Sequence, residues 1–448
     1  MSSGPSKGPA PPATGSAKQS FAPPTRLSDA ASSFFTWVAQ KDAHPIEITG
    51  GSGARFVTAD GAEWLDFGSM VWNANLGHGH PAMRRALVAA AERATLVMPS
   101  SVFPEKTDAT RRLLEIAPPG MADATGTGKV FLCLSGAEAN ENAIKMARLC
   151  TGRRRIVYRT RSYHGATLGM LSFSGDPRRA PFDPGLPDGV PWEDPYSALP
   201  HPADLEALLR REDPSTIAAV LLEGVVGANG VFVPPRGYFR RVREICDANG
   251  VLLIADEVLS GFGRTGRWFA IDHDEVAPDL LTCAKGLTGG YAPAGAVLAS
   301  AKVARFFDDH VLSCGLTAYG HPLACAAIAA AIAAYRDGDL IARAARLGEP
   351  LGAALRAVGA RRPFVREVRG IGLLWAIELS EPGARPAPSW GVASAARMKR
   401  LPAALAARRL HVHKRDNMVF VAPPLVVTEA ELDDGVSRLE AALAECFA

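Results

Sequence analysis

Between positions 77 and 330, short apolar runs alternate with stretches of helical character. The runs are apolar along their whole length, so a strand made from one of them has no face suited to water. Apolar strands separated by helices are typical of a mostly parallel sheet with helices on both faces, and ligands bind such sheets beyond the carboxyl ends of the strands. The candidate strands are Val130–Leu134, Arg155–Tyr158, Ile217–Leu222, Val251–Ala255, Leu280–Ala284 and Ala294–Ala299.

The regions on either side of this pattern are different in character. With 448 residues, 48% of them hydrophobic, the chain is long enough for more than one core. Residues 1–25 contain 20 Ser, Gly, Pro, Ala or Thr residues, which predicts a disordered arm. We expect residues 26–75 and 331–448 to form one small domain together, and residues 76–330 to form the large domain.

The flanking regions also show recognisable local patterns. In Ala54–Phe67, apolar and polar residues alternate on both sides of Asp60-Gly61, which predicts a hairpin. The segment Ser32–Gln40 is compatible with a helix. The C-terminal part predicts strands at Leu373–Leu379 and Met418–Ala422, a loop at 382–393 and a last helix from Glu429. The predicted fold class is therefore α/β: a large domain with a mostly parallel, seven-stranded type of sheet, and a smaller α+β domain built from both termini.

Two of the apolar strands end in residues that carry chemistry. Asp256 closes the strand Val251–Ala255, and Lys285 follows the strand Leu280–Ala284, 29 residues later. A lysine amine can form a Schiff base with an aldehyde, and a nearby carboxylate can hold a pyridine nitrogen protonated. This pair is what a protein must supply to use pyridoxal 5'-phosphate (PLP).

Other loops fit such a cofactor when they are taken with this pair. Ser135, Gly136 and Ala137 open a helix after a strand, and free N–H groups at a helix start favour a phosphate. Tyr163 or His164, in a loop after another strand, could stack on a flat ring. Taken alone, Ser135–Ala137 is also compatible with a plain strand-to-helix turn. The loop with Tyr163 and His164 is likewise compatible with an aromatic side chain that only fills the loop.

Two rival interpretations lack required parts. Asp256-Glu257 after an apolar strand also matches the Walker B strand of an ATPase, but 123–130 (DATGTGKV) lacks the first glycine and the final Ser or Thr of a phosphate loop. His78 and His80 resemble a metal pair, but no third ligand has matching spacing, so no metal is expected.

Charge and cysteine usage narrow the class of protein further. The net charge is +3 with scattered Lys and Arg, so neither a nucleic acid nor a membrane surface is an expected partner. The seven cysteines form no C-x-x-C pair, which indicates free thiols in a reducing compartment. Without an apolar signal segment or a run of about 20 apolar residues, we expect a cytoplasmic protein.

From about Phe34 to the C-terminus, these segments resemble the class III (omega) aminotransferases, PLP enzymes of fold type I with an aspartate aminotransferase-like fold. The motifs that carry the resemblance are the Gly136 helix start, Tyr163-His164-Gly165, Asp256-Glu257-Val258, Gly261–Gly266, Lys285–Gly290, and Thr317 before His321-Pro322. Phe34–Trp37, Gly175–Arg179 and Arg415–Pro424 are most similar to a taurine-type subgroup.

The resemblance implies a role for each matched position. Lys285 carries the internal aldimine and then moves protons, while Asp256 pairs with the pyridine nitrogen. Val258 and Tyr163 pack on opposite faces of the ring, and Glu223 lies near its substituents. The remaining implied roles are phosphate binding by Gly136 and Ala137, contact of Thr317 with the phosphate of the neighbouring subunit's cofactor, and substrate binding by Arg415. Trp72 is a further candidate for substrate binding because its aromatic side chain could wall the pocket.

Several positions depart from the family pattern. Gly224 stands where the family often has Pro, and Leu259 stands where many members have a Gln that bonds the ring hydroxyl. Asp416 stands where the subgroup usually has an aromatic residue beside Arg415.

The function expected from the residues and the resemblance together is transamination. An amino group would pass from a primary amine or omega-amino acid, with taurine as an example, to pyruvate or 2-oxoglutarate by a ping-pong mechanism in a homodimer or a tetramer. An aminomutase, racemase or lyase on the same scaffold is the alternative, and a PLP-binding protein without turnover is a third reading. Phe34, Trp37 and Trp72 are candidates for the pocket wall, or else for core or interface positions.

Overall fold

The computed structural model describes residues 33–93, 96–124, 126–182, 188–193, 199–380 and 395–447. The predicted arm at 1–25, the first residue of the helix expected from Ser32, and the loop expected at 382–393 lie outside these residues.

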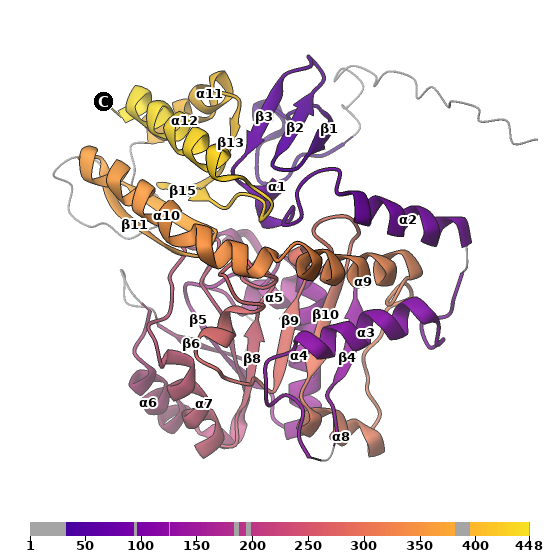
Figure 1. Ribbon diagram of the computed structural model, residues 1–448. Helices are drawn as coiled ribbons and strands as arrows, with labels where there is room; N and C mark the ends of the chain where they lie inside the picture. The colour runs from indigo at the N-terminus through magenta and orange to yellow at the C-terminus, as the bar shows by residue number, and fades with distance from the viewer. Residues whose placement is uncertain are drawn as a thin grey trace, which may run out of the picture.

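A seven-stranded sheet forms the centre of the molecule (Figure 1). Its strand order is β4-β10-β9-β8-β7-β5-β6, with β10 antiparallel to both neighbours and the other pairs parallel. This confirms the predicted fold class. The strands are β4 (Lys129–Cys133), β5 (Arg155–Arg159), β6 (Gly189–Trp192), β7 (Ile217–Glu223), β8 (Leu252–Asp256), β9 (Leu280–Cys283) and β10 (Gly295–Ala299). Only β6 was not predicted, because it is a short edge strand that contains Pro191.

Both faces of this sheet are buried. Along β7, Val220 and Leu222 pack into one hydrophobic cluster, and Ala219 and Leu221 pack into another on the opposite face. Alternate residues point to opposite faces of a strand, which explains why the strands read as continuous apolar runs. The helices of this part are α2 (Pro81–Arg93), α3 (Pro104–Ile116), α4 (Gly136–Thr151), α5 (Leu168–Ser172), α6 (Pro202–Glu212), α7 (Tyr238–Ala248), α8 (Ala301–Asp309) and α9 (Pro322–Asp337).

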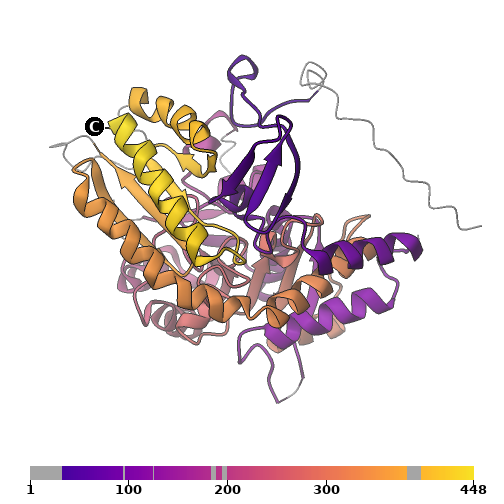
Figure 2. The same ribbon diagram turned by 45° about the horizontal axis from the view of Figure 1, so that its top comes forward.

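Two smaller sheets lie at one end of the molecule (Figures 1 and 2). One sheet has the order β1-β2-β3-β13 and joins both ends, because β3 pairs in parallel with β13. The other has the order β11-β12-β15-β14 and is antiparallel. The elements are β1 (Ile48–Ser52), β2 (Arg55–Thr58), β3 (Glu63–Asp66), α10 (Leu340–Arg361), β11 (Val365–Ile371), β12 (Leu374–Leu379), α11 (Ala395–Ala407), β13 (Leu410–His411), β14 (His413–Arg415), β15 (Met418–Val421) and α12 (Glu429–Phe447).

The segment Ser32–Gln40, which the sequence made compatible with a helix, forms no helix over its described residues 33–39. In the described part of that segment, only a short 3-10 turn, η2 (Gln40–Asp42), begins at its end. Trp37 has a φ of +65°, and the Gln40 side chain bonds the backbone of Phe35 in both directions. These local bonds replace a helical ladder.

The predicted domain boundaries at 25, 75 and 330 stay predictions. The hairpin around Asp60-Gly61 and the strands near Leu373 and Met418 are present, as β2–β3, β12 and β15. Among the described residues, no helix is both long enough and apolar enough to span a bilayer.

Candidate active site

Lys285 lies directly beyond the carboxyl end of β9. It starts the short 3-10 turn η6 (Lys285–Leu287) with a φ of +39°, a backbone conformation that non-glycine residues adopt rarely. Its Nζ lies 5.6 Å from the centre of the Trp72 ring. Burial lowers the pKa of the Lys285 amine, although Asp256 and Glu223 nearby favour the charged form. A lowered pKa makes this amine more available as a nucleophile and base.

Asp256, the last residue of β8, is held by three donors. Its Oδ2 accepts from Asn140 Nδ2 at 2.8 Å and from His164 Nδ1 at 2.7 Å, and its Oδ1 accepts from the Val258 amide at 2.9 Å. Thr282 Oγ1 in turn donates to Asn140 Oδ1 at 2.6 Å. The carboxylate is therefore fixed in position while it is almost completely buried.

Glu223 ends the next strand and lies beside Asp256 in the ladder of β7 and β8. Its two oxygens accept from the amides of Tyr163 at 3.0 Å and Gly227 at 2.8 Å. Burial raises the pKa of the Glu223 carboxyl, and the charge of Asp256 adds to this rise. Glu223, Asp256 and Lys285 thus come from three adjacent strands and meet at one edge of the sheet, as expected for a ligand site in such a fold.

The start of α4 faces the same edge. Ser135 Oγ caps the helix by accepting from the Glu138 amide, while Glu138 bonds the Leu134 amide at 2.8 Å. The first amides, those of Gly136 and Ala137, have no partner within the helix because of its geometry. A side chain at position 136 would lie 2.7 Å from Val258, so glycine lets the helix start approach β8. A phosphate fits these amides and the helix dipole.

Tyr163 lies next to a guanidinium that the sequence reasoning did not assign. Arg178 lies 4.2 Å from the centre of the Tyr163 ring and 4.8 Å from that of Trp37. Its Nη2 is 2.6 Å from Asp176. The segment Gly175–Arg179, which contains Arg178, is similar to the taurine-type subgroup, and this similarity was a signal for Arg178. No rule of sequence spacing connects Arg178 with Lys285.

Arg415, the predicted substrate-binding arginine, shares the same carboxylate. Arg415 bonds both oxygens of the buried Asp176 at 3.0 Å, and it also bonds the Asn229 side chain. Arg178 and Arg415 both lower the pKa of Asp176, against the effect of its burial. Asp416 Oδ2 also lies 3.6 Å from Arg415 Nε, so two guanidinium groups and two carboxyl groups gather beside Tyr163.

Trp72 and His413 line the side of the site near Lys285. Trp72 is 3% exposed, and its ring lies 4.6 Å from that of His413. Burial, together with the charges of His411, Arg415 and Lys285, lowers the pKa of His413 to about 4. His413 had no assigned role in the sequence reasoning, since a lone histidine in a strand carries no motif.

Some predicted residues lie apart from this cluster. Thr317 is exposed in the loop before α9, and its contact with a neighbouring subunit stays a prediction. Phe34 is 89% exposed, so it does not wall the site in this chain alone. Two positions that depart from the family pattern have a structural explanation. Leu259 packs in an apolar cluster with Trp72. A side chain at position 224 would lie 2.4 Å from Glu257 Oε1, so glycine fits there.

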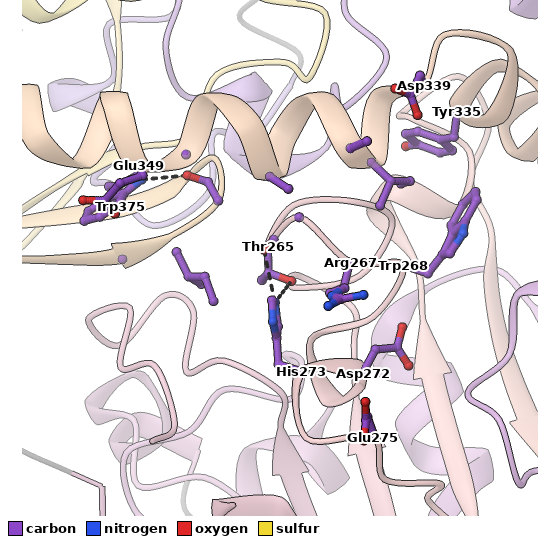
Figure 3. A pocket seen from close by; sticks show the side chains of 18 of the residues that line it. Thr265, Arg267, Trp268, Asp272, His273, Glu275, Tyr335, Asp339, Glu349 and Trp375 are labelled. Carbon is purple, nitrogen blue, oxygen red and sulfur yellow. Dashed lines mark hydrogen bonds between the residues drawn. The ribbon is translucent and has the colours of Figure 1, made fainter. Parts of the chain in front are cut away.

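A large cavity lies elsewhere. It has a volume of about 1090 Å³ and is lined by Thr265–Trp268, His273, Tyr335, α10 and Trp375 (Figure 3). None of the predicted site residues lines it. Its size alone therefore does not mark the reaction centre, whereas the strand-end cluster combines charge, burial and a helix start.

Comparison with known proteins gives consistent matches along the chain. The family model "Aminotransferase class-III" matches residues 37–443. The acetylornithine aminotransferase of Corynebacterium efficiens is 39% identical over 90% of this chain and 93% of its own length. An omega-aminotransferase of Caulobacter vibrioides is 34% identical over 90% of this chain and 94% of its own.

Two solved structures share the fold closely. The taurine:2-oxoglutarate aminotransferase of Bifidobacterium kashiwanohense, in complex with PLP and glutamate, superposes with a TM-score of 0.86 at 34% identity, covering 94% of this chain and 96% of that one. An (S)-enantioselective omega-transaminase of Thermomicrobium roseum superposes with a TM-score of 0.87 at 32% identity, covering 94% and 98%.

Proposed function

This chain belongs to the class III aminotransferases, and we propose that it moves an amino group from a donor with a primary amine and an acid group to a keto acid. Membership confirms the predicted family, enzyme class, fold type and PLP cofactor. The donor, the acceptor and the role of each residue are parts of the proposal.

The residues of the site fit PLP. Asp256 and Lys285 would hold the ring nitrogen and the aldehyde, and the amides of Gly136 and Ala137 would hold the phosphate. Val258 lies against Gly136, and Tyr163 lies beside Arg178, so each can flank the ring. When bound, the cofactor supplies an aldehyde that captures amines and a ring that accepts an electron pair.

Lys285 is the group that moves the proton. Its lowered pKa favours a neutral amine, which can remove a proton from the carbon that bears the donor's amino group and return it elsewhere. Asn140, His164 and the Val258 amide orient both oxygens of Asp256, so that this carboxyl group would be held in place to bond the ring nitrogen. Trp72 covers Lys285 and excludes water from this proton transfer.

The observation that carries the choice of donor is the pair of arginines around Asp176. A carboxylate or sulfonate can take the place of Asp176 on Arg178 or Arg415 and form charge-assisted hydrogen bonds of the same kind. The resulting preference is for an omega-amino acid or amino sulfonate as donor. Pyruvate and 2-oxoglutarate, which also carry carboxylates, are the corresponding acceptors.

A panel of donors tests this assignment in half-reactions. Holoenzyme mixed with taurine, β-alanine or an alkylamine without an acid group should lose its visible cofactor band with the first two donors. Pyruvate or 2-oxoglutarate should then restore the band. Product formed from the donor alone, without loss of the band, would instead support an aminomutase, racemase or lyase.

We also propose a homodimer. A cavity of about 600 Å³ between α2 and the start of α9 is lined almost entirely by apolar side chains and lies beside the loop that carries Thr317. Exposed apolar residues gather in the same part of the chain: Val88, Leu96, Met98 and Val102. A second copy over this surface would bury them and bring Thr317 to the partner's phosphate site. Val88→Glu should therefore yield a monomer by light scattering, and an unchanged dimer would contradict the placement.

A further inference from the structure

Trp72 is held over Lys285 by an unusual stretch of backbone. Ser69, Met70, Val71 and Trp72 have φ values of +47°, +47°, +63° and +62°. Together they form one turn of left-handed helix, labelled α1 (Ser69–Trp72) in Figure 1, which is closed by the bond from the Trp72 amide to the Gly68 carbonyl at 2.9 Å. L-residues avoid this conformation, and a β-branched residue such as Val71 avoids it most.

A buried carboxylate bonds the start of this turn. Asp66 Oδ1 accepts from the Gly68 amide at 3.1 Å and from the Met70 amide at 3.4 Å. Asp66 is completely buried at the end of β3, where it stands opposite His411 of β13.

Two imidazoles hold this carboxylate in turn. His411 Nδ1 lies 2.9 Å from Asp66 Oδ1, and His78 Nε2 lies 3.0 Å from Asp66 Oδ2. Because a carboxylate only accepts hydrogen bonds, both imidazole nitrogens donate. The three residues link segments from both ends of the chain at one point.

The opposite side of the turn is also tied down. Ser69 Oγ donates to the Ala422 carbonyl at 2.6 Å and accepts from Arg264 Nη2 at 3.2 Å. Arg264 is fully buried and also bonds the Leu373 carbonyl at 3.1 Å. A strained turn persists only when its surroundings over-determine it, and such turns gather at functional sites.

We propose that Asp66, held by His78 and His411, is a positioning residue that keeps the left-handed turn in place and thereby fixes the Trp72 indole over the Lys285 amine. Asp66 acts through Trp72 and does not itself touch the substrate. This inference rests on the proposed role of Lys285, but it makes a separate claim about how the site is built.

The first test is a double-mutant cycle with Asp66→Asn and Trp72→Phe in the holoenzyme. Asn at position 66 keeps one acceptor oxygen for the turn but cannot accept from both imidazoles. We expect each single variant to raise KM for the amine donor three- to tenfold with a smaller change in kcat, and the double variant to be no worse than Trp72→Phe alone. If the effects of the two substitutions on KM multiply in the double variant, the two residues act independently and the proposal is overturned.

A second readout does not depend on turnover. The pH midpoint of the visible cofactor band reports the surroundings of Lys285, which is faced by Asp256, Glu223, Arg178 and His413 as well as Trp72. Asp66→Asn and Trp72→Phe should shift this midpoint in the same direction, with no further shift in the double variant. An unchanged midpoint in Asp66→Asn would overturn the proposal.

A conservative pair guards against simple misfolding. His411→Asn retains an N–H near the position of Nδ1, whereas His411→Leu removes it. We expect the midpoint and KM of His411→Asn to stay close to wild type and those of His411→Leu to follow Asp66→Asn. Equal behaviour of the two would refute the role of this hydrogen bond. A holoenzyme without any visible band would instead contradict the proposed function.

Discussion

The strand-end side of the site and the side formed by Trp72, Arg178 and Arg415 differ in how the chain builds them. Asp256 and Lys285 leave neighbouring strands of one sheet whose ladder fixes their spacing. On the other side, a strained turn, a loop and the β14 strand come together from distant parts of the chain. The residues proposed to carry the chemistry are therefore held by regular elements, and the surface proposed to select the donor is held by long-range contacts.

The strained turn shows how much those contacts must contribute. At roughly 1–2 kcal/mol for each left-handed L-residue, four such residues cost on the order of 4–8 kcal/mol. That cost is comparable with the whole net stability of many proteins, so the bonds to Asp66 and Ser69 and the packing of Trp72 must offset it.

The largest predicted effect belongs to the strand-end side. Asp256→Ala removes the charge directed at the ring, and kcat should fall by about 10³-fold, the upper end of the loss seen when a preorganised electrostatic partner is removed. Steady-state kinetics at saturating donor measure this loss. A decrease of less than tenfold, with cofactor fully bound, would place the ring elsewhere.

Arg178 should affect the choice of donor and leave the chemistry intact. Loss of a charge-assisted bond of about 1.5–3 kcal/mol predicts that Arg178→Gln raises KM for taurine or β-alanine about 10- to 100-fold. The KM for an amine without an acid group should stay unchanged, and Arg178→Lys should fall between the two. Equal losses for both kinds of donor would remove Arg178 from substrate recognition.

Acid stability should report on His413. Its pKa is about 4 in the folded protein and about 6.5 in the unfolded chain, so the unfolded chain binds an extra proton between these values. The contribution of His413 therefore lowers the free energy of unfolding as pH falls from about 6.5 to 4, by up to about 3 kcal/mol.

The measurement is the difference in unfolding free energy between wild type and His413→Gln across this range, since a difference removes contributions shared by both proteins. Burial raises the pKa of Glu257 to about 7, which gives an opposite slope over part of the same range. Identical pH profiles for the two proteins would contradict the burial of a neutral His413.

The smallest predicted effect is the change in stability when glycine replaces a residue in the left-handed turn or in a right-handed helix. Val71→Gly relieves left-handed strain that Val71→Ala retains, so the Gly variant should be more stable than the Ala variant by about 1 kcal/mol. At the exposed Ala207 in the right-handed helix α6, Ala207→Gly should cost about 1 kcal/mol. Denaturant unfolding of the three variants measures whether glycine raises the free energy of unfolding at position 71 and lowers it at position 207.

The same contrast explains what could be read from the sequence. Six strands of the main sheet were predicted because β-strands buried on both faces are apolar along their length, and Lys285 and Asp256 followed because each sits at a strand end. Arg178 and His413 were not assigned, because their place depends on the meeting of β14 with a distant loop. The left-handed turn was also unpredictable, since Ser-Met-Val-Trp contains no glycine to indicate it.

Borohydride reduction of the holoenzyme, followed by peptide mapping, tests the central claim most directly. The account predicts one reduced cofactor adduct, on the ε-amine of the peptide that contains Lys285, and none in Lys285→Ala. A protein that stays colourless after incubation with PLP, or an adduct on another lysine while Lys285 is unmodified, would contradict it.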